Sequence, residues 1–350
     1  MKKEISVIIP CYNAASYIDK CIQSLLSQTF DMNKMEFIFV NDASQDNTWE
    51  ILQMYEKQYS DFMVLINLPE NSKQGTARNI GIQYAQGKYL GFCDSDDYVE
   101  SDMYEQLYNK MIETDADYVA CQRYVEKNGD IMQIDGPESD GVLELEKEEY
   151  KGTICGMAVN SSIMQCLYRR EFIENVGVLF PEKMAYEDNY FVGILNYCAK
   201  TIGLVGKPLY HYIIHPVSTI HATNASYHLD RLKIEVMKLE ELKRRGLYEK
   251  YKEDIEAQFV LLYFANTINI LMTRFEEIPE GIVLEMQKTV KQYFPNWSEN
   301  LLLQHYVAQN QKILCMLIDF PFVKGNKEEV ARAIRFIGGK LSFAISEDKY

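Results

Sequence analysis

Apolar and polar positions alternate regularly along the first third of the chain. Short apolar runs rich in β-branched residues predict buried strands, and each is followed by apolar residues at helical spacing. The predicted order is strand 5–10, helix 18–26, strand 36–40, helix 48–59, strand 62–67, helix 75–85, strand 89–92 and helix 101–112, the last capped by Ser101. This alternation predicts an α/β fold with a mostly parallel central sheet that helices cover on both faces.

Three of the predicted strands end in polar loops that could carry chemistry. Pro10-Cys11-Tyr12-Asn13 follows the first strand, Asn41-Asp42 the second and Asp94-Ser95-Asp96 the fourth. In a parallel α/β sheet the carboxyl ends of the strands lie at one edge, and ligands bind outside that edge. We therefore expect these loops to line one cleft.

Asp94 and Asp96 are the most distinctive pair of carboxylates in the chain. Only Ser95 separates them, so a turn of the backbone lets both reach one hard divalent cation and leaves coordination positions open for phosphate oxygens. The alternative is an ordinary loop that ends a strand and caps the next helix, since Asp and Ser are common in turns and caps. These residues predict a metal-diphosphate site and leave that alternative open.

Composition argues against several other classes of protein. The chain has 350 residues, is 47% hydrophobic and carries a net charge of -15, which disfavours non-specific nucleic-acid binding. Its eight cysteines form no Cys-x-x-Cys pair, so we expect buried free thiols in a reducing cytosol. We also expect no signal peptide and no membrane span, because the most apolar later segment, 259–272, is broken by Asn266 and Asn269.

Two common phosphate-binding devices are missing from the sequence. There is no Gly-x-Gly pair and no glycine-rich loop that ends in Gly-Lys-Ser or Gly-Lys-Thr, which disfavours a dehydrogenase and a P-loop nucleotidase. Segment 71–81 supplies a basic residue instead. Arg78 is expected in the first turn of a helix, whose N-terminus favours an anion. The alternative for Arg78 is a solvent-exposed helix arginine.

Four segments resemble, in order, the motifs of the family-two glycosyltransferases, which are inverting nucleotide-sugar enzymes with the A-type nucleotide-binding fold. The segments are Val7–Asn13, Val40–Thr48, Gly75–Gly81 and Phe92–Asp97. Each motif alone is weak, but their order and spacing together make the resemblance specific. It covers roughly residues 1–222.

The resemblance implies a role for most of these residues. Asp42 would accept hydrogen bonds from the base, usually uracil, and Arg78 would approach the base or the diphosphate. Asp94 and Asp96 would bind Mn or Mg. Asn41 stands where the family commonly has a second acid, which leaves the base contact to Asp42. The implied nucleotide-binding residues are Pro10, Cys11, Tyr12, Asn13, Asp42, Asn71, Gly75, Arg78, Asp94 and Ser95.

Glu187 and Asp188 resemble the family's Glu-Asp segment, in which the Asp is the catalytic base. Inverting transfer needs a carboxylate on the face of the sugar opposite the leaving nucleotide, where it takes the proton of the acceptor hydroxyl. Glu187 would hold the geometry or raise the basicity of Asp188 through like-charge proximity. Without the resemblance, an acidic pair at a helix start is explained by the helix dipole.

Segment 208–219 resembles a family loop that closes over the donor. Ile213 and His215 stand where the family often has arginine. His215 could contact the diphosphate or the metal, with Ser218 in the same loop, or be an ordinary polar lid residue. A zinc pair of His211 and His215 is disfavoured, because further ligands at the usual spacing are missing.

Two domains are expected, a catalytic domain in residues 1–222 and a helical domain in residues 223–350. Within the first, residues 118–124 predict a strand and residues 126–141 a polar loop, where acceptor specificity would lie. Helical patterns in the second domain cover 229–246, 255–275 and 282–294. The final stretch, 313–345, mixes apolar and basic residues; it fits a membrane surface, or by default a helix face packed on the protein core.

These features predict a cytoplasmic, metal-dependent inverting glycosyltransferase that moves a hexose or N-acetylhexosamine from a UDP-sugar to a growing cell-surface glycan. A lipid-linked acceptor, peripheral membrane contact through the C-terminal helices and a homodimer are further expectations. A nucleotidyltransferase is disfavoured because its glycine-rich loop is missing. The remaining alternative, a non-catalytic nucleotide-binding scaffold of a polysaccharide-assembly complex, is disfavoured by the presence of Asp94, Asp96 and Asp188.

Overall fold

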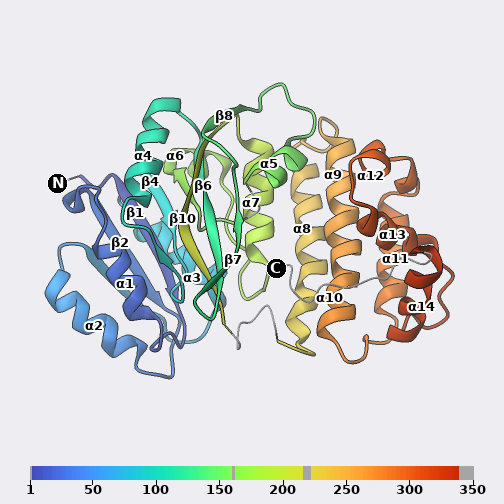
Figure 1. The fold of residues 1–350 in the computed structure, drawn as a ribbon, viewed down its shortest axis with the longest axis horizontal. Helices are drawn as coiled ribbons and strands as arrows, with labels where there is room; N and C mark the ends of the chain where they lie inside the picture. The colour runs from blue at the N-terminus through green and yellow to red at the C-terminus, as the bar shows by residue number, and fades with distance from the viewer. Residues whose placement is uncertain (1, 160–161, 216–221, 339–350) are drawn as a thin grey trace. The chain divides into compact units, whose positions relative to one another are not determined.

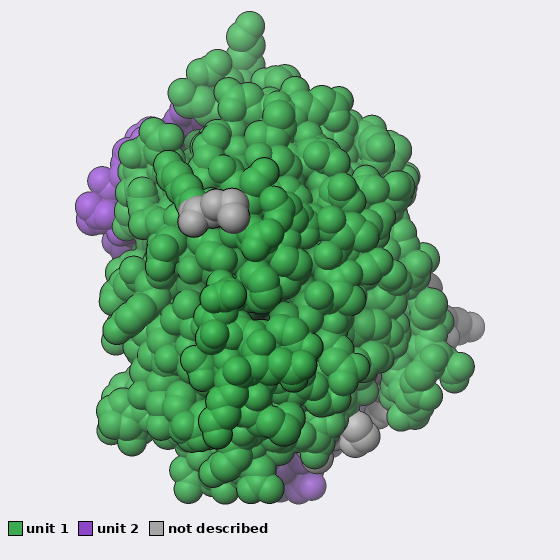
Figure 2. All heavy atoms as spheres, turned by 90° about the vertical axis from the view of Figure 1, so that its left-hand side faces the viewer, with its two compact units in different colours: residues 1–215 green, residues 216–350 purple. Residues whose placement is uncertain are grey.

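The chain forms two compact units, residues 1–215 and residues 216–350 (Figure 2). The computed structural model describes residues 2–159, 162–215 and 222–338. The predicted domain boundary, after residue 222, falls near the start of the second unit. Residues 216–221 lie outside the described part of the chain.

The first unit is built on one sheet. Its strands are β1 Ile5–Cys11, β2 Met35–Asn41, β3 Met63–Asn67, β4 Tyr89–Phe92, β5 Tyr98–Val99, β6 Tyr118–Lys127, β7 Asp130–Asp135, β8 Gly141–Glu144, β9 Cys166–Arg169 and β10 Thr201–Ile214. The strand order is β3-β2-β1-β4-β9-β6-β10-β5, with β7 paired to β6 and β8 to β10. Pairing is parallel from β3 to β4 and between β6 and β10, whereas β9 is antiparallel to both of its neighbours.

Helices flank this sheet (Figure 1). They are α1 Ile18–Leu26, α2 Thr48–Tyr59, α3 Lys73–Tyr84, α4 Met103–Thr114, α5 Lys151–Val159, α6 Arg170–Val176 and α7 Glu187–Cys198. Strands β1 and β2 are buried at every position, as expected for strands covered on both faces. The predicted α/β class is therefore confirmed.

Two predicted helix starts are wrong. Helix α4 begins at Met103 rather than at Ser101, and no side chain caps its N-terminus, so the polar residues before it belong to the preceding turn. Helix α3 begins at Lys73, two residues earlier than predicted, although Lys73 itself has a positive φ of 64°. Arg78 consequently lies in the second turn of α3 rather than the first.

The predicted polar loop 126–141 is also wrong. Strand β6 runs on to Lys127, and the chain then reverses through Asn128 and Gly129 into β7. Both turn residues have positive φ, 53° and 88°. Asn-Gly is the dipeptide preferred in such two-residue hairpins, because both positions need positive φ. The polar composition of this stretch therefore reflects an exposed hairpin.

An aromatic cluster lies beneath the end of β4. Phe180 stacks on Phe191 with ring centroids 3.9 Å apart, and Phe92 meets Phe180 edge-on at 5.8 Å. All three side chains are buried. The cluster joins the last residue of β4 to the segment that precedes α7, and so fixes two parts of the chain on which candidate site residues lie.

The second unit is helical. Its helices are α8 Asp230–Arg244, α9 Lys252–Phe259, a π-helical segment Val260–Ala265, α10 Asn266–Arg274, α11 Ile282–Tyr293, α12 Leu301–His305, α13 Gln309–Met316 and α14 Lys327–Gly338. The helical patterns predicted from the sequence correspond to these elements with shifted ends. Where residues 339–345 were included in the last pattern, they lie outside the described residues.

The prediction that two asparagines break the apolar segment 259–272 is wrong. Residues Lys252–Arg274 form a continuous 23-residue helix that is long and apolar enough to cross a membrane by length and composition. Asn266 and Asn269 do not interrupt it, because asparagine is compatible with a helix interior. Of its most apolar window, 56% is buried within the structure, and a buried core helix meets the same two criteria.

Candidate active site

The loops after β1, β2 and β4 lie together at the carboxyl edge of the sheet. The backbone N–H of Asp42 donates to the carbonyl of Cys11 at 2.8 Å. Strands β1 and β4 are parallel neighbours, and the backbone N–H of Cys93, at the start of the loop after β4, donates to the Ile8 carbonyl at 3.1 Å. The three loops singled out in the sequence are thus neighbours.

Asp42 is buried at one side of this edge. Its Oδ1 accepts a hydrogen bond from the backbone N–H of Ser72 at 2.7 Å, and its carbonyl faces the Asn71 amide at 3.4 Å. Burial raises the pKa of Asp42, and the N–H groups of Ser72 and Lys73 oppose that shift. Tyr12 follows Cys11, whose carbonyl accepts from the Asp42 backbone N–H. Its side chain is 48% exposed, so its ring is open to a ligand.

Asn13 and Asn41 hold the loop that follows β2. Asn13, at φ 51°, accepts from the backbone N–H of Gln45 at 2.7 Å and donates its own backbone N–H to Ser44 Oγ at 3.0 Å. Asn41 donates to Asn67 Oδ1 at 2.7 Å and accepts from Ser44 Oγ at 2.6 Å. An ionised acid at position 41 would have no proton to donate to Asn67. This explains the amide where the family pattern commonly has a second acid.

Asp94, Asp96 and Asp97 form an acidic cluster whose ligand atoms lie within 4.8 Å of one another. Among the residues that the structure describes, it is the one group of three or more acidic, histidine or cysteine side chains placed to hold a metal ion. The Asp96 side chain is 44% exposed. Partial burial of the Asp96 carboxyl, together with the charge of Asp94, raises its pKa to about 6. His215 acts in the opposite direction.

Asp97 differs from the other two carboxylates. It is buried, and both of its oxygens already accept hydrogen bonds, from the Tyr210 hydroxyl at 2.6 Å and the Ile213 N–H at 2.8 Å. Tyr210 also lies 3.2 Å from the backbone nitrogen of Asp94. Asp97 therefore pins the acidic loop to β10, which leaves Asp94 and Asp96 as the carboxylates that can reach a cation.

Arg78 is buried between two acids. Its side chain is 2% exposed; it donates to Asp94 Oδ1 at 2.9 Å and pairs with Glu187 Oε1. The exposed-arginine alternative is thus wrong. The charges of Asp94, Glu187 and Asp188 outweigh burial and raise the pKa of Arg78, so the guanidinium is charged and lies close to all three carboxylates.

Glu187 and Asp188 begin α7. Glu187 is buried; burial raises its pKa to about 6, while Arg78 favours its ionised form. Asp188 is only half-buried, and its Oδ1 accepts from the backbone N–H of Asn189 at 2.9 Å. Of this pair, Asp188 is therefore the more accessible carboxylate.

The two candidate lid histidines have separate surroundings. His215 lies against the Tyr17 ring at 4.1 Å, and its Nε2 is 3.9 Å from Asp96 Oδ2. His211 is buried and contacts the carboxylates of Glu126 and Glu100. The two histidines thus contact different carboxylates. Ser218 lies outside the described residues.

Several supporting residues were not found from the sequence. Asn79 exchanges two hydrogen bonds of 2.9 Å with the backbone of Phe180. Tyr210 holds Asp97, which is 113 residues away in the chain. No local pattern marks such long-range contacts. Gly75, which the resemblance assigns to nucleotide binding, packs against Pro181: a Cβ at this position would lie 2.4 Å from the Pro181 carbonyl oxygen.

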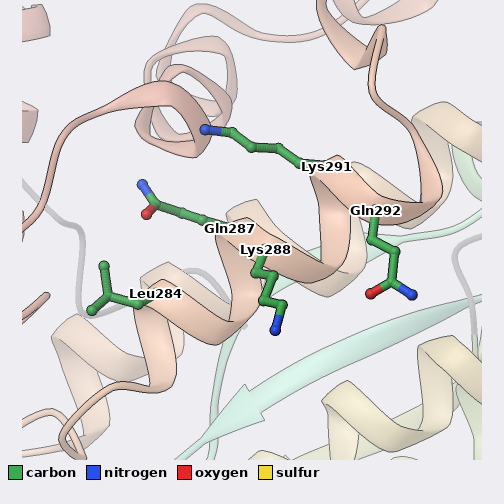
Figure 3. Close-up of a pocket in the computed structure, with 5 residues that line it drawn as sticks. All are labelled: Leu284, Gln287, Lys288, Lys291 and Gln292. Atoms are coloured by element: carbon green, nitrogen blue, oxygen red, sulfur yellow. The ribbon is translucent and has the colours of Figure 1, made fainter.

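A separate open pocket lies on α11 in the second unit (Figure 3). It is lined by Leu284, Gln287, Lys288, Lys291 and Gln292. Gln287 already donates to the carbonyls of Leu317 and Phe320, and Lys291 is 3.0 Å from Asp319. The pocket includes none of the candidate site residues.

Comparison with known proteins identifies the relatives of this chain. The EpsH protein of Bacillus subtilis is 30% identical over 260 residues, which cover 73% of this chain and 74% of EpsH. The poly(ribitol-phosphate) beta-N-acetylglucosaminyltransferase TarS of Staphylococcus aureus is 25% identical over 295 residues, which cover 80% of this chain and 48% of TarS.

Solved structures show the same fold. Residues 1–349 of S. aureus TarS, in complex with UDP-GlcNAc, match with a TM-score of 0.70 and 20% identity, covering 95% of this chain and 90% of that one. The mannosyltransferase PcManGT of Pyrobaculum calidifontis, in complex with GDP-Man and Mn2+, matches with a TM-score of 0.51 and 13% identity, covering 96% and 87%. The predicted A-type fold with C-terminal helices is confirmed. The family model for glycosyl transferase family 2 matches residues 6–177, and with the EpsH relationship it establishes that the chain belongs to this family.

Proposed function

We propose that this enzyme transfers a hexose or N-acetylhexosamine from a UDP-sugar to a glycan acceptor, with inversion, in cell-surface polysaccharide synthesis such as that of cell wall or capsule. The observation that carries the proposal is that the buried guanidinium of Arg78 pairs with Asp94 and with Glu187, the residue next to Asp188. One carboxylate for the leaving diphosphate and one for the acceptor hydroxyl are the two that inverting transfer needs. The TarS complex with UDP-GlcNAc supports the choice of donor.

The nucleotide would bind at the carboxyl edge of β1 and β2. Tyr12 offers an exposed ring, and Asp42 offers a carboxylate beside the backbone N–H of Ser72. Asn13 shapes the same loop. In this proposal the remaining nucleotide-binding residues are Pro10, Cys11, Gly75, Asp94 and Ser95.

Asp94 and Asp96 would hold a divalent metal, Mn or Mg. The donor set fits a hard cation, since two carboxylates from one loop leave positions open for phosphate oxygens. The exposed Asp96 oxygen and its raised pKa also fit, because an acid crowded by like charge gains from a nearby cation. When bound, the metal would neutralise charge that develops on the leaving diphosphate. The Mn2+ complex of PcManGT supports this assignment.

Asp188 would act as the general base. Its carboxylate takes the proton of the acceptor hydroxyl as that oxygen attacks the anomeric carbon, and the bond from that carbon to the diphosphate breaks. Glu187, paired with Arg78, would hold the start of α7 in place. His215, beside Asp96, would contact the diphosphate together with Ser218.

The remaining proposals concern location and partners. We place the enzyme in the cytoplasm, at the inner face of the membrane, with residues 1–222 catalytic and residues 223–350 accessory. The second unit exposes Val323 at 80% and Phe336 at 81%, and Lys324, Arg332 and Arg335 are exposed too. Apolar and basic side chains of this kind favour an anionic membrane surface. A homodimer remains the alternative use of this face.

The test is release of UDP from a panel of UDP-sugars, with Mn2+ added or chelated. We expect slow hydrolysis of one sugar that stops when the metal is chelated. UDP binding without hydrolysis, in the presence of bacterial glycan acceptors as well, would instead indicate the non-catalytic scaffold. Absence of nucleotide binding would contradict the proposal.

A further inference from the structure

One face of α3 contacts two parts of the candidate site. Gly75, Arg78 and Asn79 are spaced i, i+3 and i+4, so they share a side of the helix. Gly75 and Asn79 contact the backbone at Pro181 and Phe180, and Arg78 reaches Glu187. This face therefore holds the whole segment that leads into α7.

Arg78 extends that contact to the acidic loop. One terminal nitrogen donates to Asp94 Oδ1 at 2.9 Å and to Gln74 Oε1 at 3.3 Å, while the other pairs with Glu187. The two acids are 16 and 109 residues away in the chain. A single buried cation thus joins the loop after β4 to the start of α7.

Both terminal nitrogens of Arg78 are in use, and its Nε is buried without a hydrogen-bond partner. The side chain is 2% exposed, so a base or a diphosphate has little access to the guanidinium unless one of the paired acids moves away. Removing one partner from a buried pair leaves an uncompensated charge, which is strongly unfavourable. The geometry is therefore that of a fixed internal link.

We infer that Arg78 is a positioning residue, which sets the metal-side carboxylate Asp94 and the base Asp188 relative to each other through Glu187, and that it does not bind the nucleotide. This inference rests on the proposed function. It replaces the nucleotide contact that the family resemblance implies for Arg78. A displacement of about 1 Å in a catalytic group can reduce turnover about 100-fold, so a misplaced link should affect kcat more than binding.

The experiment compares wild type with Arg78→Lys, Glu187→Gln and the double variant. Turnover is followed by UDP release, and UDP affinity is measured separately by calorimetry with Mn2+. We expect kcat to fall about 100-fold in each single variant, with UDP affinity within about threefold of wild type. The double variant should be no worse than the more affected single variant, because residues that act as one unit are not additive.

Arg170→Lys is the matched control. Arg170 pairs with Glu174 at 2.7 Å within α6. It follows β9, whose Arg169 lies opposite Tyr89 at the start of β4, whereas Asp94 follows the end of β4. This arginine–carboxylate pair is thus at the other edge of the sheet, and its variant should retain both turnover and UDP affinity.

Several outcomes would overturn the inference: weaker UDP binding with kcat preserved, unchanged kinetics, or additive losses in the double variant. If Arg78→Lys does not fold, Glu187→Gln carries the same expectation for kcat and affinity. Wild type that hydrolyses no UDP-sugar would contradict the proposed function alone. In that case, additive free energies of unfolding among the four proteins would still refute a link between Arg78 and Glu187.

Discussion

At the scale of single residues, the carboxylates of the site differ in the groups that already contact them. Asp97 has both oxygens occupied by Tyr210 and Ile213, whereas Asp96 is partly exposed beside His215. The three acids are adjacent in sequence, so their different tasks could not be predicted locally. The sequence motif predicts which acids lie together in the site. The role of each acid depends on its partners from distant parts of the chain.

This division predicts opposite effects for neighbouring substitutions. Asp97→Ala leaves a tyrosine hydroxyl and a backbone N–H without their acceptor, so it should lower the free energy of unfolding by about 1–3 kcal/mol. Asp96→Asn should leave stability nearly unchanged and abolish the Mn2+ dependence of UDP binding. Urea unfolding and calorimetry measure the two quantities. Equal loss of metal-dependent UDP binding in both folded variants would show that Asp97 is also a ligand.

At the scale of secondary-structure elements, α3 is the helix on which the site depends most. Its Gly75 lies against the Pro181 carbonyl, and a Cβ there would also meet Glu187 Cγ at 3.1 Å. Glycine is therefore required by close approach of two segments, because the backbone oxygen of Pro181 cannot rotate away.

Gly75→Ala should push α3 away from the segment before α7, destabilise the first unit by about 1–3 kcal/mol, and lower kcat. Gly156→Ala is the control: Gly156 lies inside α5, where an added Cβ meets nothing within 4 Å. That substitution should stabilise the protein by about 0.5–1 kcal/mol, since glycine is unfavourable inside a helix. Thermal and urea unfolding check both. A neutral Gly75→Ala would mean that the two segments are not held in this packing.

Some helices and strands could be predicted from the sequence alone, and others could not. Periodicity located β1, β2, α1 and α2 well, because both strands are buried throughout and both helices have apolar residues at helical spacing. It missed β7, whose residues are exposed on both faces, although Asn128-Gly129 signals the hairpin. It missed antiparallel β9, since strand direction depends on partners far along the chain. The burial of Arg78 likewise depends on an acid 109 residues away.

At the scale of the whole molecule, the two units carry different titratable groups. His228 is buried in the second unit, with Nε2 2.8 Å from the Ala222 carbonyl and its ring near Tyr227 and Phe275. Burial lowers the pKa of His228 below 6.5, and the charge of Arg274 acts in the same direction. The folded protein thus favours the neutral imidazole over the protonated one.

The stability of the second unit should consequently fall as the pH is lowered below 6.5. Below that pH, His228 binds a proton in the unfolded chain but not in the folded protein. This lowers the free energy of unfolding by at most about 1.4 kcal/mol per pH unit. Trp49 and Trp297 are the two tryptophans of the chain, one in each unit. Fluorescence of Trp297 in a Trp49→Phe background follows this unfolding. His228→Gln should flatten the pH dependence; an equally steep dependence in that variant would refute the assignment.

The central claim is that Asp188 is the base of an inverting sugar transfer, and the most direct test is the turnover of Asp188→Asn with its best UDP-sugar. General-base help is typically worth 10²- to 10⁴-fold, so we predict that kcat falls by about that factor. UDP affinity in the presence of Mn2+ should stay within about twofold of wild type. An Asp188→Asn enzyme as fast as wild type, or one whose only defect is weaker UDP binding, would contradict the account.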